Sequence, residues 1–282
     1  MINICLSFDN KFAIPAKVLI SSILLNSNCD DRFSFFILDD GLKKDIKVDI
    51  ERLKSFKQFN IRFINVDKSV FKNYYLPEKG HFALVNYYRI KIPSLIPEVN
   101  KILYIDCDTI VKKSLRPLYE IDISNFYLAA AKSVTSYKNN RRLGLSKLGP
   151  YYNSGVILIN SCKWKENTIE SKLIEYIETS PIEKLRNLEQ DAINSVLRNG
   201  IYRLPSNWNV EIRTDINYPN YYKKYLENPY ILHYVSNDKP WHSNTKQDTK
   251  EFNYYLGKIK QLNHNNSKET FSQKRDLHPY QS

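Results

Sequence analysis

The stretch KILYIDCDTIV at residues 101–111 decides the fold, because an apolar run ends directly in two acids. Residues 101–105 have the composition of a buried strand, and Asp106 and Asp108 follow it one residue apart. Alternation along an extended chain places two such carboxylates on the same side. They can therefore reach one divalent cation if the backbone turns there. The alternative is an ordinary polar strand end without a ligand.

Short apolar runs alternate with helical patterns on both sides of this strand. Further strands are expected at residues 3–8, 33–38, 60–66, 127–131, 156–160 and 230–234, and helices at 15–25, 42–56, 84–92, 163–179 and 189–198. Strands separated by helices of this length predict an α/β fold. Its sheet is expected to be mixed but mostly parallel, with helices on both faces.

The domain organisation is expected to be simple. Residues 1–260 show no linker or internal repeat, and they predict a single catalytic domain. Residues 261–282 are polar, basic and low in aliphatic side chains, so this tail is expected to be loosely ordered or close to a membrane.

Acids follow several of the expected strands. Asp9 comes after the first strand, Asp39 and Asp40 come after the second, and Asp106 and Asp108 come after the fourth. Ligands of such sheets bind at the carboxyl ends of the strands. The sequence therefore places its candidate binding site at this edge.

The composition indicates an anionic partner but limits how it can be held. With 42 Lys and Arg against 30 Asp and Glu, the 282-residue chain carries a formal charge of +12, yet it has only 7 glycines. Neither a G-x-G-x-x-G fingerprint nor a Walker A loop is present. A bound phosphate would therefore be held by a metal, by side-chain cations or by isolated backbone amides.

The cysteines and the amino terminus indicate where the protein works. Cys5, Cys107 and Cys162 lie in or beside apolar runs, Cys29 is far from them, and all are expected to be reduced, the first three in the core. This pattern favours the cytoplasm. The first residues lack a signal-peptide pattern, and no apolar run approaches the roughly 20 residues of a membrane span.

The stretch ILHYVSNDKPWH at residues 231–242 is the second candidate for ligand chemistry. His233 lies inside an apolar strand, where a satisfied core histidine is the alternative to a metal ligand. Lys239 and His242 follow closely. A histidine ligand with nearby cations would suit a diphosphate bridged by the metal of Asp106 and Asp108.

Two further segments carry polar groups beside structural signals. In YYNSGVILIN, Asn153 and Ser154 precede Gly155, which either lines a ligand site or relieves a bend at the entry of a strand. In NLEQDAIN, three polar side chains open a helix: Glu189, Gln190 and Asp191. Acids in a first helical turn also complement the helix dipole without any further role.

In order and spacing these segments resemble glycosyltransferase family 8, the retaining nucleotide-sugar transferases, over about residues 2–242. The resemblance implies the GT-A fold with its Rossmann-like nucleotide-binding core. It also implies transfer of galactose or glucose from a UDP-sugar to a hydroxyl of a saccharide or lipid-linked glycan acceptor, as in lipopolysaccharide or another cell-surface glycan.

The resemblance assigns roles to individual residues. Asp106, Asp108 and His233 would hold Mn²⁺, with Mg²⁺ as an alternative. The residues implied to bind the nucleotide or donor sugar are Ser7, Asp9, Asn10, His81, Arg89, Asp106, Cys107, Asp108, Asn153, Ser154, Gly155 and Lys239. Those implied to lie at the reaction centre are Glu189, Gln190 and Asp191.

This chain departs from the family pattern at Ser133, where several bacterial members carry an acid that contacts the acceptor, and at Glu189, where close relatives carry Asp. The residue under the donor sugar is Gln190, and a neutral amide is a poor nucleophile. The pattern therefore favours attack of the acceptor from the face that UDP leaves.

The positive charge has two interpretations. The basic stretch 132–148 and the tail would hold the protein to an anionic membrane that carries the acceptor, on the cytoplasmic face of the inner membrane. The alternative is a solvated basic surface. A nucleic-acid partner is not expected, because the basic residues are dispersed and no nucleic-acid-binding motif is present.

Two other functions share some of these features. A nucleotidyltransferase that forms sugar nucleotides would need a glycine-rich loop after its first strand, and the first glycine of this chain is Gly41. A non-catalytic sugar-nucleotide-binding protein would keep the fold, although complete metal ligands speak against it.

Overall fold

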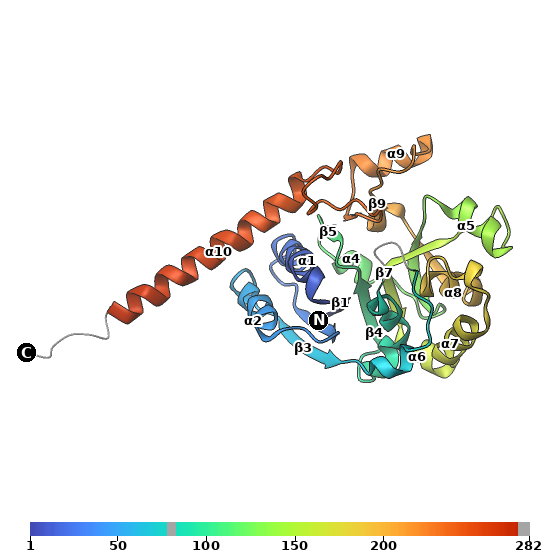
Figure 1. The fold of residues 1–282 in the computed structure, drawn as a ribbon, viewed down its shortest axis with the longest axis horizontal. Helices are drawn as coiled ribbons and strands as arrows, with labels where there is room; N and C mark the ends of the chain where they lie inside the picture. The colour runs from blue at the N-terminus through green and yellow to red at the C-terminus, as the bar shows by residue number, and fades with distance from the viewer. Residues whose placement is uncertain (78–82, 276–282) are drawn as a thin grey trace, which may run out of the picture.

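A seven-stranded sheet forms the centre of the computed structural model, which describes residues 1–77 and 83–275 (Figure 1). The strand order is β3-β2-β1-β4-β7-β6-β8. The strands are β1 (Ile2–Phe8), β2 (Phe33–Asp39), β3 (Asn60–Asn65), β4 (Lys101–Ile105), β6 (Leu128–Lys132), β7 (Tyr152–Asn160) and β8 (Ile201–Leu204). Only β7 runs antiparallel to both of its neighbours, β4 and β6. The predicted mixed, mostly parallel sheet is therefore confirmed.

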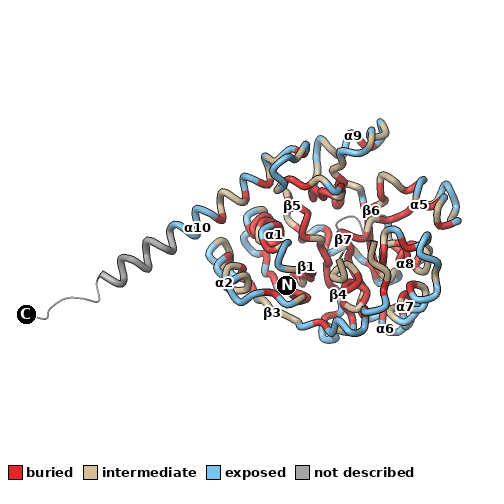
Figure 2. The backbone as a smooth tube through the Cα atoms, viewed as in Figure 1, coloured by how far each residue is buried: buried red, intermediate tan, exposed pale blue. Residues whose placement is uncertain are grey.

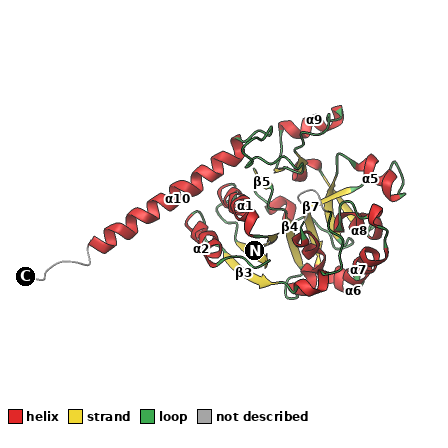
Figure 3. Cartoon of the chain, viewed as in Figure 1, coloured by secondary structure: helices red, strands yellow, loops and turns green. Residues whose placement is uncertain are grey.

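Helices cover both faces of this sheet (Figure 3). The α-helices of the described residues are α1 (Ala13–Leu25), α2 (Lys44–Arg52), α3 (Ile92–Leu95), α4 (Arg116–Tyr119), α5 (Ser136–Leu143), α6 (Ser161–Glu166), α7 (Ile169–Thr179), α8 (Glu189–Val196), α9 (Asn220–Glu227) and α10 (Lys250–Arg275). Among the described residues, none of these helices is long and apolar enough to cross a membrane.

The alternation of β4 divides the core into two layers. Leu103 and Ile105 pack in the cluster that contains the buried faces of α1, α2 and α10. Ile102 and Tyr104 point the other way, into the cluster formed with α6, α7 and α8. Since successive side chains of a strand point to opposite faces, an apolar run like β4 is buried on both sides, as Figure 2 shows for the central strands.

A second, three-stranded sheet begins immediately after the two acids. It consists of β5 (Thr109–Val111), β10 (Ile231–His233) and β9 (Val210–Glu211), with β10 in the middle. β10 pairs antiparallel with β5 and parallel with β9, so His233 lies opposite Thr109 and beside Glu211. The turn between β4 and β5 therefore lies where the two sheets meet.

Two expected helices differ from their prediction. The segment expected as a helix at residues 84–92 is a 3₁₀ helix, Leu84–Lys91. In an α-helix the Asn86 carbonyl would accept a hydrogen bond from the backbone amide of residue 90. Here the same carbonyl accepts from Arg89 Nε, 3.0 Å away. The helix expected at 163–179 divides into α6 and α7, because Thr168 takes a left-handed conformation with φ of 51°.

One cysteine also differs from its prediction, and α10 continues through residue 275. Phe252, Tyr255 and Ile259 anchor its first turns in the core. Cys162 is exposed, contrary to the prediction of a core residue, because α6 turns it away from the sheet.

The packing of β7 can be tested with two leucines. Leu158 is fully buried between β4 and β6, whereas Leu148 is 96% exposed. Leu158→Ala is expected to lower the free energy of unfolding by about 2–5 kcal/mol, because it removes buried contacts and leaves a cavity. Leu148→Ala should change it by less than about 0.5 kcal/mol. Urea unfolding measures both, and equal effects would contradict this packing.

Candidate active site

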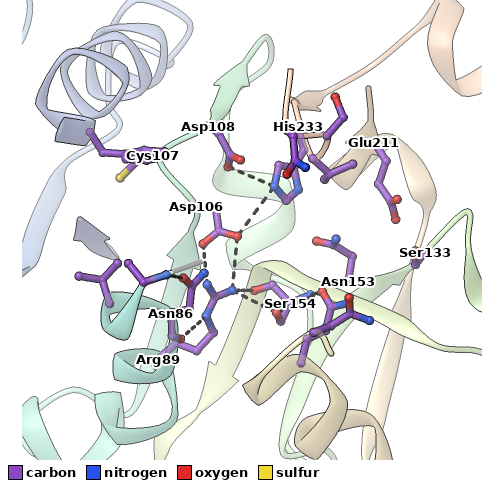
Figure 4. A pocket seen from close by; sticks show the side chains of 18 of the residues that line it. Asn86, Arg89, Asp106, Cys107, Asp108, Ser133, Asn153, Ser154, Glu211 and His233 are labelled. Carbon is purple, nitrogen blue, oxygen red and sulfur yellow. Dashed lines mark hydrogen bonds and ion pairs between the residues drawn. The ribbon is translucent and has the colours of Figure 1, made fainter. Parts of the chain in front are cut away.

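A cavity of about 730 Å³ opens at the carboxyl ends of β1 and β4, beside the second sheet (Figure 4). Its walls come from β1 and the turn after it, the 3₁₀ helix Leu84–Lys91, the β4–β5 turn, β7, α8, β9 and β10. This is the edge of the sheet that the acids after the strands predicted. The volume lies within the range of small-molecule sites in proteins.

Asp106, Asp108 and His233 converge at one end of this cavity. Each offers a ligand atom, and these atoms all lie within 4.8 Å of one another. His233 Nε2 is 3.2 Å from Asp108 Oδ1 and 3.8 Å from Asp106 Oδ2. Two carboxylates and an imidazole form a donor set that suits a divalent cation. The residues present therefore fit the predicted metal.

The imidazole of His233 is oriented by a second layer of contacts. Its Nδ1 lies 2.9 Å from Asn209 Oδ1, and Asn209 in turn donates to Asn153 Oδ1 at 2.8 Å. An amide oxygen accepts, so Nδ1 donates to it, and Nε2 is the nitrogen that faces the carboxylates. Partners of this kind fix the tautomer and the ring orientation of metal-binding histidines.

Gly155 allows the close approach of β7 to these ligands. A Cβ at this position would lie 2.2 Å from His233 Cε1 and 2.6 Å from Asp106 Oδ2, distances that only a glycine avoids. The Asp106 amide also donates to the Gly155 carbonyl at 2.7 Å. Gly155 lies inside β7, so the explanation by a bend at the strand entry is wrong.

Arg89 connects Asp106 of the β4–β5 turn to α8. Its side chain is 2% exposed; Nη2 is 2.8 Å from Asp106 Oδ1, and Nε is 3.0 Å from Glu189 Oε1. Nη1 donates to the Ser154 carbonyl at 2.7 Å, and the guanidinium stacks on Tyr104. Burial raises the pKa of Glu189 to about 7, and the charge of Arg89 opposes that rise.

Lys239 neutralises Asp108. Its ammonium lies 2.7 Å from Asp108 Oδ2, donates to the Tyr234 carbonyl and is 2% exposed. Burial works against ionisation of Asp108, but Lys239 and His233 hold the pKa of this carboxyl well below its usual range. In this structure Lys239 lies behind the carboxylate and is not part of the cavity wall.

The predicted nucleotide-binding segment after β1 lies partly in the cavity wall. Ser7 lines the cavity and donates to the Val85 carbonyl at 3.0 Å, while Asp9 lines it and caps the short 3₁₀ turn that follows. Asn10 faces away, because its amide bridges Gly41 and the amide of residue 43.

Cys107 and His81 were also predicted to bind the nucleotide or donor sugar. Cys107 lines the cavity between the two acids, and its buried thiol lies 3.8 Å from the Ser7 carbonyl. His81 falls outside the described residues.

The residues predicted for the reaction centre separate into two groups. Glu189 and Gln190 line the cavity together with Asn153 and Ser154. Gln190 Oε1 accepts from the Ser154 amide at 2.9 Å, which holds it against β7. Asp191 is fully buried and points away from the cavity.

Asp191 instead holds neighbouring segments together. Its carboxylate is 2.6 Å from Arg142 Nη2, 2.6 Å from the Tyr151 hydroxyl and 2.7 Å from the Asn187 amide. Arg142 belongs to the basic stretch 132–148, so part of that charge is neutralised inside the protein. These contacts predict a positioning role for Asp191.

Glu211 is a cavity residue that the sequence analysis did not identify. It lies on β9, is 1% exposed and lines the cavity near Ser133. A strand of two residues carries no periodic pattern, so no sequence signal marked this acid.

Comparison with known proteins identifies the family. The sequence model of Glycosyl transferase family 8 matches residues 3–245. The chain belongs to this family. Since the match includes both sheets and every metal-binding candidate, the protein is a family 8 glycosyltransferase with a GT-A-like fold.

Individual relatives cover nearly the whole family 8 domain. General stress protein A of Bacillus subtilis (strain 168) is 29% identical over 89% of this chain and 92% of its own length. Lipopolysaccharide 1,2-glucosyltransferase of Escherichia coli is 28% identical over 85% of this chain and 73% of its own.

A solved structure gives the same result for the fold. The galactosyltransferase LgtC, crystallised in complex with donor and acceptor sugar analogs, superimposes with a TM-score of 0.79. It is 25% identical, and the match covers 91% of this chain and 96% of LgtC.

The glycine at the metal ligands of this family 8 enzyme provides a test. Gly155→Ala is expected to weaken Mn²⁺ binding by about 10- to 100-fold, because the new methyl group displaces His233 or Asp106. Gly257→Ala is the control, since nothing lies within 4 Å of a Cβ there. Isothermal titration with MnCl₂ measures both. Unchanged binding in Gly155→Ala would contradict the site geometry.

The positioning role of Asp191 gives a second test. Asp191→Asn is expected to lower the free energy of unfolding by about 1–3 kcal/mol, because it weakens a fully buried network. Binding of UDP with Mn²⁺ to the folded variant should be unchanged. Lost UDP binding at unchanged stability would instead place Asp191 at the donor.

Proposed function

We propose that the protein is a retaining hexosyltransferase that moves galactose or glucose from a UDP-sugar to a hydroxyl of a saccharide acceptor. Mn²⁺, with Mg²⁺ as an alternative, would be held by Asp106, Asp108 and His233. The observation that carries the proposal is their convergence at the end of a cavity large enough for a sugar nucleotide. When bound, the cation would stabilise negative charge on the departing UDP.

The protein's own groups would bind and orient the donor. Ser7 and Asp9 lie where the nucleoside would lie, and Cys107 would contact it from the β4–β5 turn. Asn10 would support this loop from behind, through its bridge to the β2–α2 loop. The contribution of His81 rests on the family resemblance.

Arg89 and Lys239 would control the charge around the diphosphate. Arg89 holds Asp106 in place while it is anchored to Glu189, so its main task would be positioning. Lys239 is paired with Asp108. Once a cation shares the charge of Asp108, the ammonium could turn toward the diphosphate, the role predicted from the family.

The groups near the donor sugar favour front-face displacement. Asn153, Ser154 and Gln190 would contact the sugar, and Gly155 would let β7 approach it. Of the acids predicted at the reaction centre, neither is available as a nucleophile, because Glu189 is paired with Arg89 and Asp191 with Arg142. The acceptor oxygen would therefore form its bond to the anomeric carbon as the bond to UDP breaks. The departing phosphate would take the acceptor proton, and the configuration would be retained.

The acceptor would be a saccharide of lipopolysaccharide or another cell-surface glycan, including a lipid-linked one. The E. coli relative supports this class. Basic residues would then hold the enzyme to the cytoplasmic face of an anionic membrane. In that case salt should release the protein from anionic vesicles, and partitioning that does not change with salt would contradict membrane binding.

The activity is tested with a panel of UDP-sugars assayed for Mn²⁺-dependent UDP release. UDP-galactose or UDP-glucose should be turned over, and Asp106→Asn should abolish the Mn²⁺-dependent rate. Gln190→Ala should keep part of it, because the amide is not the nucleophile. Asp45→Asn, at an exposed acid, is the matched control.

Two results would contradict this proposal. UDP release that does not differ among the sugars and is no greater with Mn²⁺ would remove the transferase function and leave a binding protein. A glycosyl adduct trapped on Glu189 or Asp191 would overturn the front-face mechanism.

A further inference from the structure

Glu211 carries a buried oxygen that has no hydrogen-bond partner. Its Oε1 accepts from the Val134 amide at 3.2 Å. Within the described part of the chain, Oε2 has no such partner, although the residue is 1% exposed and lines the cavity. Buried polar atoms are nearly always paired, so an orphan at a cavity wall indicates a group that the ligand supplies.

Arg213 does not satisfy this oxygen. Its Nη1 lies 3.6 Å from Glu211 Oε2, which is too long for a hydrogen bond. The other guanidinium nitrogens are directed to Asp215, with Nε 3.0 Å from Oδ1 and Nη2 2.7 Å from Oδ2. Arg213 therefore balances the charge of Glu211 from a distance and leaves Oε2 available.

The position of Glu211 is fixed by its backbone. Its amide donates to the Tyr222 hydroxyl at 2.8 Å, and the Tyr218 hydroxyl donates to its carbonyl at 3.0 Å. The strand register places it beside His233. Because its backbone is fixed, the Glu211 carboxylate can bind a hydroxyl without a prior rearrangement of the strand. Such preorganisation is typical of a specific binding site.

The surroundings of Glu211 match a saccharide. Figure 4 shows its carboxylate directed toward the space that Asn153 also faces, on the side of His233 away from Asp106, with Ser133 beyond. Ser133 is 3% exposed, and its hydroxyl interacts with the Glu211 carboxyl, in place of the acid that the family pattern led us to expect. A diphosphate at Asp106 and Asp108 would leave this part of the cavity for sugar hydroxyls.

We infer that Glu211 Oε2 accepts a hydrogen bond from a saccharide hydroxyl and that Glu211 is a specificity-determining residue of the transfer. The inference rests on the proposed function, because it places a hexose beyond the metal ligands. The hydroxyl belongs to the donor hexose or to the acceptor, and the experiment distinguishes these two sources.

The test pairs Glu211→Gln with deoxygenated substrates. The amide keeps the shape of the side chain and the bond to Val134, but it presents a donor where Oε2 accepts. Donors are UDP-galactose, UDP-glucose and their deoxy analogues, assayed by UDP release with water as acceptor. Acceptors are methyl hexosides and their deoxy analogues. Glu227→Gln, on exposed α9, is the control.

The loss of activity with one deoxy analogue is expected to depend on Glu211. The wild type should lose about 10- to 100-fold in kcat/KM with the analogue that lacks the recognised hydroxyl, whereas Glu211→Gln should treat that analogue and its parent alike. The remaining analogues should be affected equally in both proteins. Coupling in the donor series assigns a donor hydroxyl, and coupling in the acceptor series assigns an acceptor hydroxyl.

Binding of UDP with Mn²⁺ separates this inference from damage to the metal site. Because UDP lacks the hexose, Glu211→Gln should bind it like the wild type, with an unchanged melting temperature, and Glu211→Ala should show the same coupling pattern. Equal loss with every substrate, no loss in either series, or weakened UDP binding would overturn the inference. Absence of Mn²⁺-dependent UDP release in the wild type would instead overturn the proposed function.

Discussion

Asp106, Asp108 and Glu189 need cationic partners, and the rest of the site depends on the pairs that they form. Arg89 pairs with Asp106 and Glu189, and Lys239 pairs with Asp108. These cations are 2% exposed, and a buried charge without its partner is strongly destabilising. The pairs therefore fix the β4–β5 turn against α8 on one side and against the segment after β10 on the other. Asp106, Asp108 and His233 converge only when both sheets are in place.

Because buried acids need cationic partners, part of the chain's positive charge acts inside the protein. The formal charge of +12 suggested an anionic partner, yet Arg89, Lys239 and Arg142 act inside the protein as counterions of buried acids. Positive charge at the site is thus paired with carboxylates. Under the proposed function such a site would need no glycine-rich loop, because a cation and side-chain charges would replace it.

The sheet and the position of Asp106 and Asp108 at its edge could be predicted from the sequence because their signals are local. An apolar strand that runs into Asp106 and Asp108 specifies both its burial and its position at the sheet edge. Contacts between distant segments left no such signal. The need for glycine at residue 155 arises from His233, almost eighty residues later, and the pairing of Lys239 with Asp108 joins two separate turns. Glu211 lies on a strand too short to show a pattern, and its partners, Val134 and Tyr222, come from other elements.

The central claim is that Asp106, Asp108 and His233 hold a divalent cation that also binds the diphosphate of a nucleotide. Electron paramagnetic resonance of Mn²⁺, titrated with UDP or with UMP present, tests this claim directly. If the cation and the diphosphate share one site, each must strengthen the binding of the other. The account predicts that Mn²⁺ binds about tenfold more tightly with UDP than with UMP. Equal Mn²⁺ affinity with the two nucleotides would contradict it.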